Sequence, residues 1–417
     1  MGFIQRNKGY VVTVGIEFAI IALSFLVYRV ANENLSSFGF SEYSLSRRTI
    51  SLLQPLFMIG LGVAIPRYTS VYPQRSSILS TGILLLAGAT VLFSFFLLIG
   101  RSFFADLFFG DTGYSPYIFP LLLMLFGYCL HSALYGFLRG KHNVYFANGL
   151  QLLNIGSIPV LVILFTSDVL HLLYYTGVIL ISVCMLTTVA VIGQYRSNFT
   201  KQKFLVDGRT LLRYGLPRVL GDFALLALIT APTYLVLYFQ EDILISGDVA
   251  YSITLLNIVG AAFGPLGLVI LPEVAGFLNK KSYSLIKRRF NLFIVVSLLA
   301  TIVGYSIYFL FSDFILSILL GAEYRSNIRQ VSLIILAGSF GYGLYIVLRS
   351  FLDAIKVRAT NSINLIITLA LYALLVFYNY LQDADTEAFL TSFAICMNFL
   401  GLITLIQTYR AIRELHE

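Results

Sequence analysis

Glu17-Phe-Ala-Ile-Ile-Ala-Leu23 recurs in the second half of the chain as Asp222-Phe-Ala-Leu-Leu-Ala-Leu228. A second pair supports the repeat, since Phe126-Gly-Tyr-Cys-Leu-His-Ser-Ala-Leu-Tyr-Gly-Phe-Leu138 returns as Phe340-Gly-Tyr-Gly-Leu-Tyr-Ile-Val-Leu-Arg-Ser-Phe-Leu352. Both copies of the first pattern put a carboxylate inside a long apolar run. Two related halves, each with an acid in a hydrophobic segment, are typical of membrane transporters rather than of anchors or channel subunits.

The composition is that of a membrane protein. Of the 417 residues, 58% are hydrophobic and only 12% are charged, with a mean hydropathy of +0.86. A soluble domain is about half apolar and a quarter charged. The net charge of +8 comes from cations dispersed along one side of the predicted topology, which argues against a nucleic-acid partner. The first apolar stretch is too long for a signal-peptide core and is interpreted as an uncleaved span.

Apolar runs long enough to cross a bilayer predict an all-α polytopic membrane protein with twelve transmembrane helices. They lie at about residues 10–30, 42–66, 78–100, 114–138, 145–166, 170–193, 211–238, 248–272, 290–311, 328–353, 358–380 and 387–409. No connection between them is long enough to form a soluble domain.

The connections predict orientation and lobes. Most Lys and Arg residues fall on the side of the N-terminus, so both termini are expected in the cytoplasm. The longest connection, from Gln194 to about Arg213, separates the two repeats and predicts two pseudo-symmetric six-helix lobes, residues 1–198 and 199–417. Six spans is an even number, so the lobes should be related by an axis along the membrane normal.

The second span of each half is interrupted by glycine and proline, which predicts kinks. The residues are Pro55, Gly60, Gly62 and Pro66 in one half, and Gly260, Gly264, Pro265, Gly267 and Pro272 in the other.

Covalent chemistry finds little support, so the sequence predicts that the protein is not an enzyme. The four histidines have no metal-binding spacing, and neither a phosphate-binding glycine loop nor a nucleophile motif is present. No metal or cofactor is expected.

Glu17 and Asp222 are the strongest candidates for ion coupling, because an ionised carboxylate in hydrocarbon normally faces a cavity or a partner. The alternative is a protonated acid with a packing role. Arg218 lies one helical turn from Asp222, so these two could simply neutralise each other.

Arg47 and Arg48 are the candidates for binding an anionic substrate, because an arginine fork suits phosphate or carboxylate. Gln54 falls at a helical spacing from them and extends a polar stripe. The aligned positions of the second half are Ile253 and Thr254, so the repeat does not require these cations. The alternative is that both side chains reach the outer headgroups.

His131 and the pair Arg349 and Asp353 are weaker candidates. His131 is interpreted as a core histidine with satisfied hydrogen bonds. Arg349 and Asp353 stand at i and i+4, which predicts a structural ion pair near the cytoplasmic side.

Four motifs carry a resemblance to a known family. The family's second helix resembles Gly39-Phe-Ser-Glu-Tyr-Ser-Leu45 followed by Pro66-Arg-Tyr68, and its fourth-to-fifth helix junction resembles Tyr135-Gly-Phe-Leu-Arg-Gly-Lys141. Its seventh helix begins like Arg213-Tyr-Gly-Leu-Pro-Arg218, and the external turn before its tenth is similar to Leu320-Gly-Ala-Glu-Tyr324. In this order, over essentially the whole chain, they resemble the bacterial polysaccharide flippases of the multidrug/oligosaccharidyl-lipid/polysaccharide exporter (MOP) superfamily.

The resemblance implies a MATE-like fold in the bacterial inner membrane. It implies that O-antigen or similar repeat units, carried on a polyprenyl pyrophosphate, move from the cytoplasmic to the outer leaflet through a cavity between the lobes. The cargo would contact Arg47 or Arg48, and Glu17 or Asp222 would couple a proton or sodium gradient. A polysaccharide polymerase and a chain-length regulator are the implied protein partners, beside the membrane lipids.

Three alternatives remain open at this point. A drug exporter of the same fold would favour cationic ligands and an acid-lined cavity, which the arginine pair argues against. A membrane polysaccharide polymerase would usually need a large external loop. A purely structural assembly partner would have no reason to retain buried charges.

Overall fold

The computed structural model describes residues 8–72, 74–195, 200–240, 242–321, 324–356 and 360–415. Every regular element in these ranges is a helix, which confirms the predicted all-α class. The first half comprises α2 (Lys8–Asn34), α3 (Ser36–Met58), α4 (Leu61–Val71), α5 (Ser77–Ile99), α6 (Arg101–Phe109), η1 (Thr112–Tyr117), α7 (Ile118–Gly140), α8 (Val144–Gln151), η2 (Leu152–Ser157), α9 (Ile158–Ile163) and α10 (Val169–Gln194). The rest comprises α11 (Lys201–Gln240), α12 (Ile243–Asn279), α13 (Tyr283–Leu320), α14 (Asn327–Leu336), α15 (Ser339–Ile355), α16 (Thr360–Leu381) and α17 (Thr386–Arg413).

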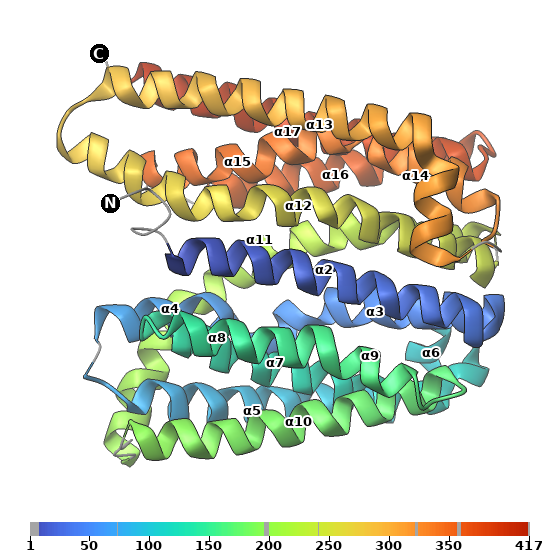
Figure 1. The fold of residues 1–417 in the computed structure, drawn as a ribbon, viewed down its shortest axis with the longest axis horizontal. Coiled ribbons are helices and arrows are strands. Elements are labelled where there is room, and N and C mark those ends of the chain that lie inside the picture. The colour runs from blue at the N-terminus through green and yellow to red at the C-terminus, as the bar shows by residue number, and fades with distance from the viewer. Residues whose placement is uncertain are drawn as a thin grey trace. The chain divides into compact units, whose positions relative to one another are not determined.

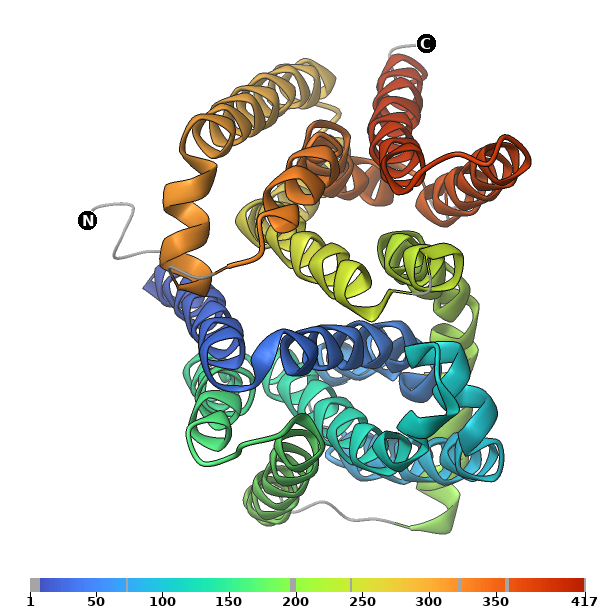
Figure 2. The ribbon, with the colours of Figure 1, turned by 90° about the vertical axis from the view of Figure 1, so that its right-hand side faces the viewer.

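Within the described ranges, ten helices are long and apolar enough to cross a membrane, and the count rises to 12 when each of two bent helix pairs forms one span. Each of the twelve runs predicted from the sequence coincides with one of these spans. The protein is therefore a multi-pass membrane protein, with about 20 residues per crossing as hydrocarbon thickness requires. Figure 2 shows the helices of each half nearly end-on, as expected for bundles of spans.

The chain divides into two compact units, with the division inside α11. Unit 1 extends to Phe223 and includes Leu319–Gly321, and unit 2 holds the remainder from Ala224 onward. The predicted lobe boundary, between residues 198 and 199, lies outside the described residues.

Helix α7 forms the centre of unit 1. It packs against α3, α4, α5, α8 and α10, and Figure 1 shows α10 running alongside it. Most of its side chains are buried, including the apolar Leu125, Leu130 and Phe137, which are fully inaccessible. Because its neighbours cover it on several sides, α7 is a rigid support for the polar side chains that it carries.

Helix α15 has the matching place in unit 2, between α12 and α17. A methyl group added at Gly341 would lie 2.2 Å from the backbone oxygen of Met397, so α15 and α17 meet backbone to backbone. Asn398 stabilises this contact by accepting a hydrogen bond from the Gly341 amide and donating one to the Ala337 carbonyl. Small residues thus allow the close helix approach that is typical of membrane bundles.

Two spans are broken by sharp bends. Helices α3 and α4 meet at 49° around Ile59 and Gly60, and α14 and α15 meet at 43°. The first break falls where glycine and proline interrupt the second span, as predicted. The corresponding span of the second half, α12, is helical throughout, and the break in unit 2 lies in the tenth span instead.

Gly60 should be intolerant of any side chain. Its φ is +76°, and an added Cβ would lie 2.2 Å from the Gly215 backbone oxygen on α11. We expect Gly60→Ala to lower the free energy of unfolding by more than the about 1–2 kcal/mol that the left-handed conformation alone costs. Thermal unfolding of the purified protein in detergent measures this. Gly62→Ala is the control, because its Cβ would meet only Met58 Cε, at 3.5 Å. Equal melting temperatures would contradict the prediction.

Candidate functional site

Arg47 lies on α3 and faces α7. Its Nη1 donates a hydrogen bond to the Tyr128 hydroxyl, and its guanidinium carbon lies 5.0 Å from the centre of the Tyr128 ring. Tyr28 and Tyr43 complete its surroundings, and both rings are buried. Arg47 itself is partly exposed. In the described part of the chain its charge meets tyrosine hydroxyls and no carboxylate, so it remains available to an anion.

Gln54 continues the same face of α3 two turns further on. Its Nε2 donates a hydrogen bond to Ser132 Oγ at 3.0 Å. Because Ser132 follows Tyr128 by one turn of α7, two polar stripes face each other. We name these four residues, Arg47, Gln54, Tyr128 and Ser132, the α3–α7 seam. Arg47 and Gln54 thus lie on one face of α3, and the binding role of the seam stays a prediction.

Arg48, the neighbouring residue on α3, differs from Arg47 in exposure. It is 4% exposed and therefore buried. Of the two arginines predicted to bind an anion, Arg47 is the accessible one. A guanidinium inside a membrane span is costly unless it has a function or a partner, so this difference in exposure favours Arg47 as the ligand-binding residue.

Glu17 lies on α2 and contacts the fifth span. Its Oε1 accepts a hydrogen bond from Gln151 Nε2 at 3.0 Å, and the side chain is partly exposed. One turn earlier, Thr13 Oγ1 accepts from Asn148 Nδ2 at 3.0 Å and from Arg139 Nη1 at 3.2 Å. Among the described residues no cation pairs directly with Glu17. The acid therefore faces an amide, an arrangement that suits binding and release of a proton or cation.

The fifth span widens into a π-helical turn, η2, immediately after Gln151. Such turns are rare and occur frequently at functional sites. Within it, Asn154 Nδ2 lies 3.2 Å from His131 Nδ1 and donates to Cys184 Sγ at 3.3 Å. His131 is 5% exposed, so it has the buried, hydrogen-bonded position expected of a core histidine.

The environment of Asp222 and Arg218 differs from that of Glu17, the repeated acid of the first half. Both side chains are exposed on α11. Arg218 stacks on Tyr214, with 3.7 Å from its guanidinium carbon to the ring centre, and donates to the Tyr214 carbonyl. The two repeated acids, Glu17 and Asp222, therefore do not share one environment.

Arg349 and Asp353 lie on the last turns of α15. The Arg349 guanidinium carbon is 6.0 Å from the Tyr345 ring centre. Asn361 of α16 donates to Asp353 Oδ1 at 2.7 Å and to the Arg349 carbonyl at 3.0 Å. Asn361 thus ties the end of α15 to the start of α16, and the Arg349–Asp353 ion pair stays a prediction.

Unit 2 contains a buried ion pair that the sequence did not predict. Asp248 is inaccessible, and its Oδ2 lies 3.3 Å from Arg325 Nη2 and accepts a hydrogen bond from Asn327. When the two halves are aligned so that Arg47 matches Ile253, the residue that matches Asp248 is Glu42. Glu42 accepts hydrogen bonds from Tyr114 and Tyr117 at 3.0 and 2.9 Å. In both halves an acid early in the second span thus holds the segment before the fourth span, and this repeated spacing was the signal available in the sequence.

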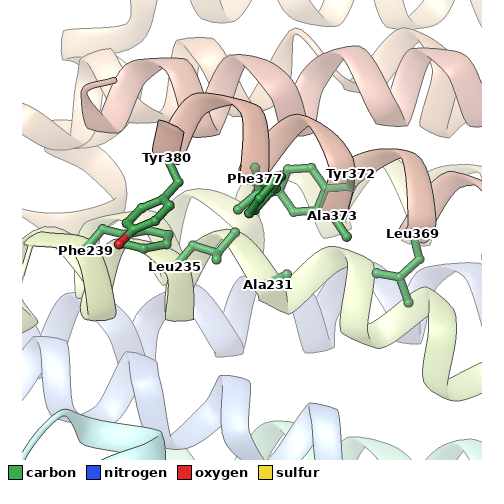
Figure 3. A pocket seen from close by; sticks show the side chains of 9 residues that line it. Ala231, Leu235, Phe239, Leu369, Tyr372, Ala373, Phe377 and Tyr380 are labelled. Carbon is green, nitrogen blue, oxygen red and sulfur yellow. The ribbon is translucent and has the colours of Figure 1, made fainter. Parts of the chain in front are cut away.

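A groove in unit 2 has a different character. Phe239 and Leu235 of α11 face Tyr380, Phe377 and Tyr372 of α16 across a cavity of about 330 Å³ (Figure 3). Its lining is aliphatic and aromatic without a charged group. The described residues contain no group of three or more His, Cys, Asp or Glu side chains that could hold a metal ion.

Comparisons with known proteins identify the fold. No family model matches the sequence, and no curated protein matches it either. One similar structure is a MOP superfamily transporter from Pyrococcus furiosus, which is described as having a binding pocket of reverse polarity that suggests a different function. It is 12% identical to this chain, with a TM-score of 0.71, and the match covers 99% of this chain and 97% of that one. An inward-facing multidrug resistance MATE family transporter is 14% identical over 98% of this chain and 99% of its own, with a TM-score of 0.70. An outward-facing one is 12% identical over 98% and 96%, with a TM-score of 0.68. These likenesses confirm the predicted MATE-like fold.

Proposed function

We propose that this protein is an exporter that works by alternating access and flips a lipid-linked oligosaccharide, carried on polyprenyl pyrophosphate, to the outer leaflet. One observation carries the proposal. Arg47 is a partly exposed cation inside a membrane span, and in the described part of the chain no carboxylate neutralises it. A pyrophosphate cannot be solvated by lipid, so a cargo of this class needs such a cation on its path.

The surroundings of Arg47 suit this role. A guanidinium can bind two oxygens of a phosphate through parallel hydrogen bonds, and it does so in a fixed plane. Tyr128 takes one Arg47 N–H and holds the plane from the side of α7. The remaining donors are left for a ligand, while Gln54 and Ser132 offer neutral hydrogen-bonding groups of the kind that meet sugar hydroxyls.

Drug export is the competing function, because multidrug transporters have the same fold. A cationic drug requires an accessible acid where it binds, whereas the α3–α7 seam presents an arginine. The Pyrococcus furiosus transporter of this fold is described by a reverse polarity of its binding pocket, which suggests a different function for that protein. In the present chain it is the charge of Arg47 that favours an anionic cargo.

Deleting the gene and locating the lipid-linked glycan tests the proposal in cells. We expect glycolipid to accumulate on the cytoplasmic leaflet, inaccessible to a membrane-impermeant glycosidase in intact spheroplasts and accessible after lysis. Single repeat units accumulating on the outer leaflet would indicate a defect in polymerisation instead. An unchanged glycolipid distribution would exclude the proposed cargo.

Coupling to an ion gradient is assigned to Glu17. We expect Glu17→Gln to fold normally, since a glutamine Oε1 can still accept the Gln151 hydrogen bond, but to lose the carboxylate that exchanges a proton or sodium ion. Export into inverted vesicles should then respond several-fold less to an imposed gradient. Glu33→Gln is the control on the same helix, because Glu33 is exposed and pairs with Arg29. Unchanged gradient dependence in Glu17→Gln would make Glu17 a structural residue.

A further inference from the structure

A second cationic site lies in unit 1, where α4 meets the first part of α11. A pocket of about 430 Å³ is lined by Tyr68, Arg209, Thr210, Arg213 and Tyr214, which we name the Arg–Tyr pocket. Arg209 and Arg213 stand one turn apart on α11 and therefore extend from one face. Helix α11 has 40 residues, about twice the number that spans hydrocarbon, so part of it must project beyond the membrane core.

The positive charge of the pocket is not neutralised locally. Both lining arginines are exposed, and among the described residues neither forms a hydrogen bond or ion pair. The nearest acid along the helix, Asp207, is 5% exposed and otherwise engaged. Its carboxylate accepts a hydrogen bond from Ser77 at 2.6 Å and lies 3.6 Å from Arg75. An anion in the pocket would thus meet two unpaired guanidinium groups.

The aromatic part of the pocket is held in place by its neighbours. Arg67 donates to the Tyr214 hydroxyl at 3.1 Å and lies 4.6 Å from the centre of that ring. Tyr68 packs edge-on against Tyr214, with 5.6 Å between ring centres. The Gly60–Gly215 backbone contact described above fixes α4 against α11. The pocket is therefore preformed rather than a chance cluster of surface arginines.

We propose that the Arg–Tyr pocket binds the phosphate group of a lipid at the membrane surface. Basic pockets beside membrane helices bind anionic headgroups. The distribution of Lys and Arg predicts that this region lies on the cytoplasmic side, where anionic lipids attract basic segments. The tyrosine rings offer an amphipathic wall at the depth where headgroup and acyl chain meet. Two sources carry this chemistry, an anionic phospholipid and the pyrophosphate of a lipid-linked cargo. Binding of the first is independent of the function proposed above.

Native mass spectrometry of the full-length protein in detergent tests the site. The probes are phosphatidylglycerol, sugar-free polyprenyl pyrophosphate, zwitterionic phosphatidylcholine and inorganic phosphate. We expect Arg209→Gln/Arg213→Gln to weaken binding of an anionic lipid by about 30-fold, from the loss of two cations near the headgroup. Lys201→Gln/Lys203→Gln removes the same charge from the same helix outside the pocket, and should change affinity by less than about 3-fold.

The lipid that binds more tightly identifies the source of the phosphate. Equal losses in the two double variants would overturn the proposal, because the effect would then be one of overall surface charge. Equal binding of phosphatidylcholine, or of inorganic phosphate at the same concentration, would overturn it too. Because no transport is measured, a failure of the glycolipid function leaves the phosphatidylglycerol result intact.

Discussion

Replacing Arg47 with Ala is expected to lower export of the anionic glycolipid by about 10- to 100-fold, the range for losing a hydrogen-bonded ion contact. Protein level should be unchanged, since Arg47 is partly exposed and its removal leaves only a tyrosine hydroxyl without its partner. Arg47→Lys should recover part of the activity, because lysine keeps the charge but loses the planar fork. Surface glycan per cell, normalised to protein in the membrane, measures the effect.

Two further variants separate binding from packing at this site. Tyr128→Phe keeps the ring beside Arg47 and removes only the hydroxyl, so we expect a smaller loss than in Arg47→Ala. Arg101→Ala removes an exposed cation from α6 and should leave export unchanged. Full export by the Arg47→Ala/Arg48→Ala double variant would show that both arginines only anchor the second span at the headgroups.

Of all the proposed substitutions, Arg325→Met should lower the free energy of unfolding the most, by about 3–5 kcal/mol. The reason is that it leaves the inaccessible Asp248 carboxylate without its cation. Asp248→Leu/Arg325→Met should recover most of this loss, since hydrophobic residues of similar volume often replace a buried pair at no net cost. Unfolding of the purified protein in detergent, followed by circular dichroism against denaturant, gives the free energies.

Arg329 supplies the matched control one turn away. It pairs with Asp313 at 3.1 Å, but the Arg329 side chain is 49% exposed and that of Asp313 is 62% exposed. Exposed pairs contribute at most about 1 kcal/mol, so Arg329→Met should cost little. Similar losses in Arg325→Met and Arg329→Met would show that burial of Asp248 does not determine the energetics of this segment.

The spans themselves were predictable because hydrophobic thickness is a strong constraint on length and composition. All twelve predicted runs coincide with helices, including those that break. The position of the second break was not predictable from glycine and proline counts. Helix α12 contains both residue types yet stays helical, whereas α14 and α15 separate beside Gly338, which packs closely against α17: an added Cβ would lie 3.0 Å from Met397 Cβ.

The candidate site was predictable in part. An arginine in a span is conspicuous in any sequence, but exposure distinguishes Arg47 from Arg48, and exposure depends on how α3 is rotated against α7. The Asp248–Arg325 pair was harder to find, because both residues lie near predicted span ends, where charges are ordinary. Only their approach across the fold makes them a buried pair, although the shared register of Glu42 and Asp248 indicated that this acid belongs to the repeat.

Reconstitution of the purified protein into liposomes measures its cargo most directly. Pyrophosphate-linked oligosaccharide is placed in one leaflet, and its exposure to a glycosidase added on the other side is followed over time with an ion gradient imposed. We expect the wild-type protein to transfer the glycolipid across the bilayer and Arg47→Ala to transfer it at least about ten times more slowly. Proteoliposomes that leave the glycolipid in its original leaflet while transporting a cationic drug would contradict the flippase and identify a drug exporter of the same fold.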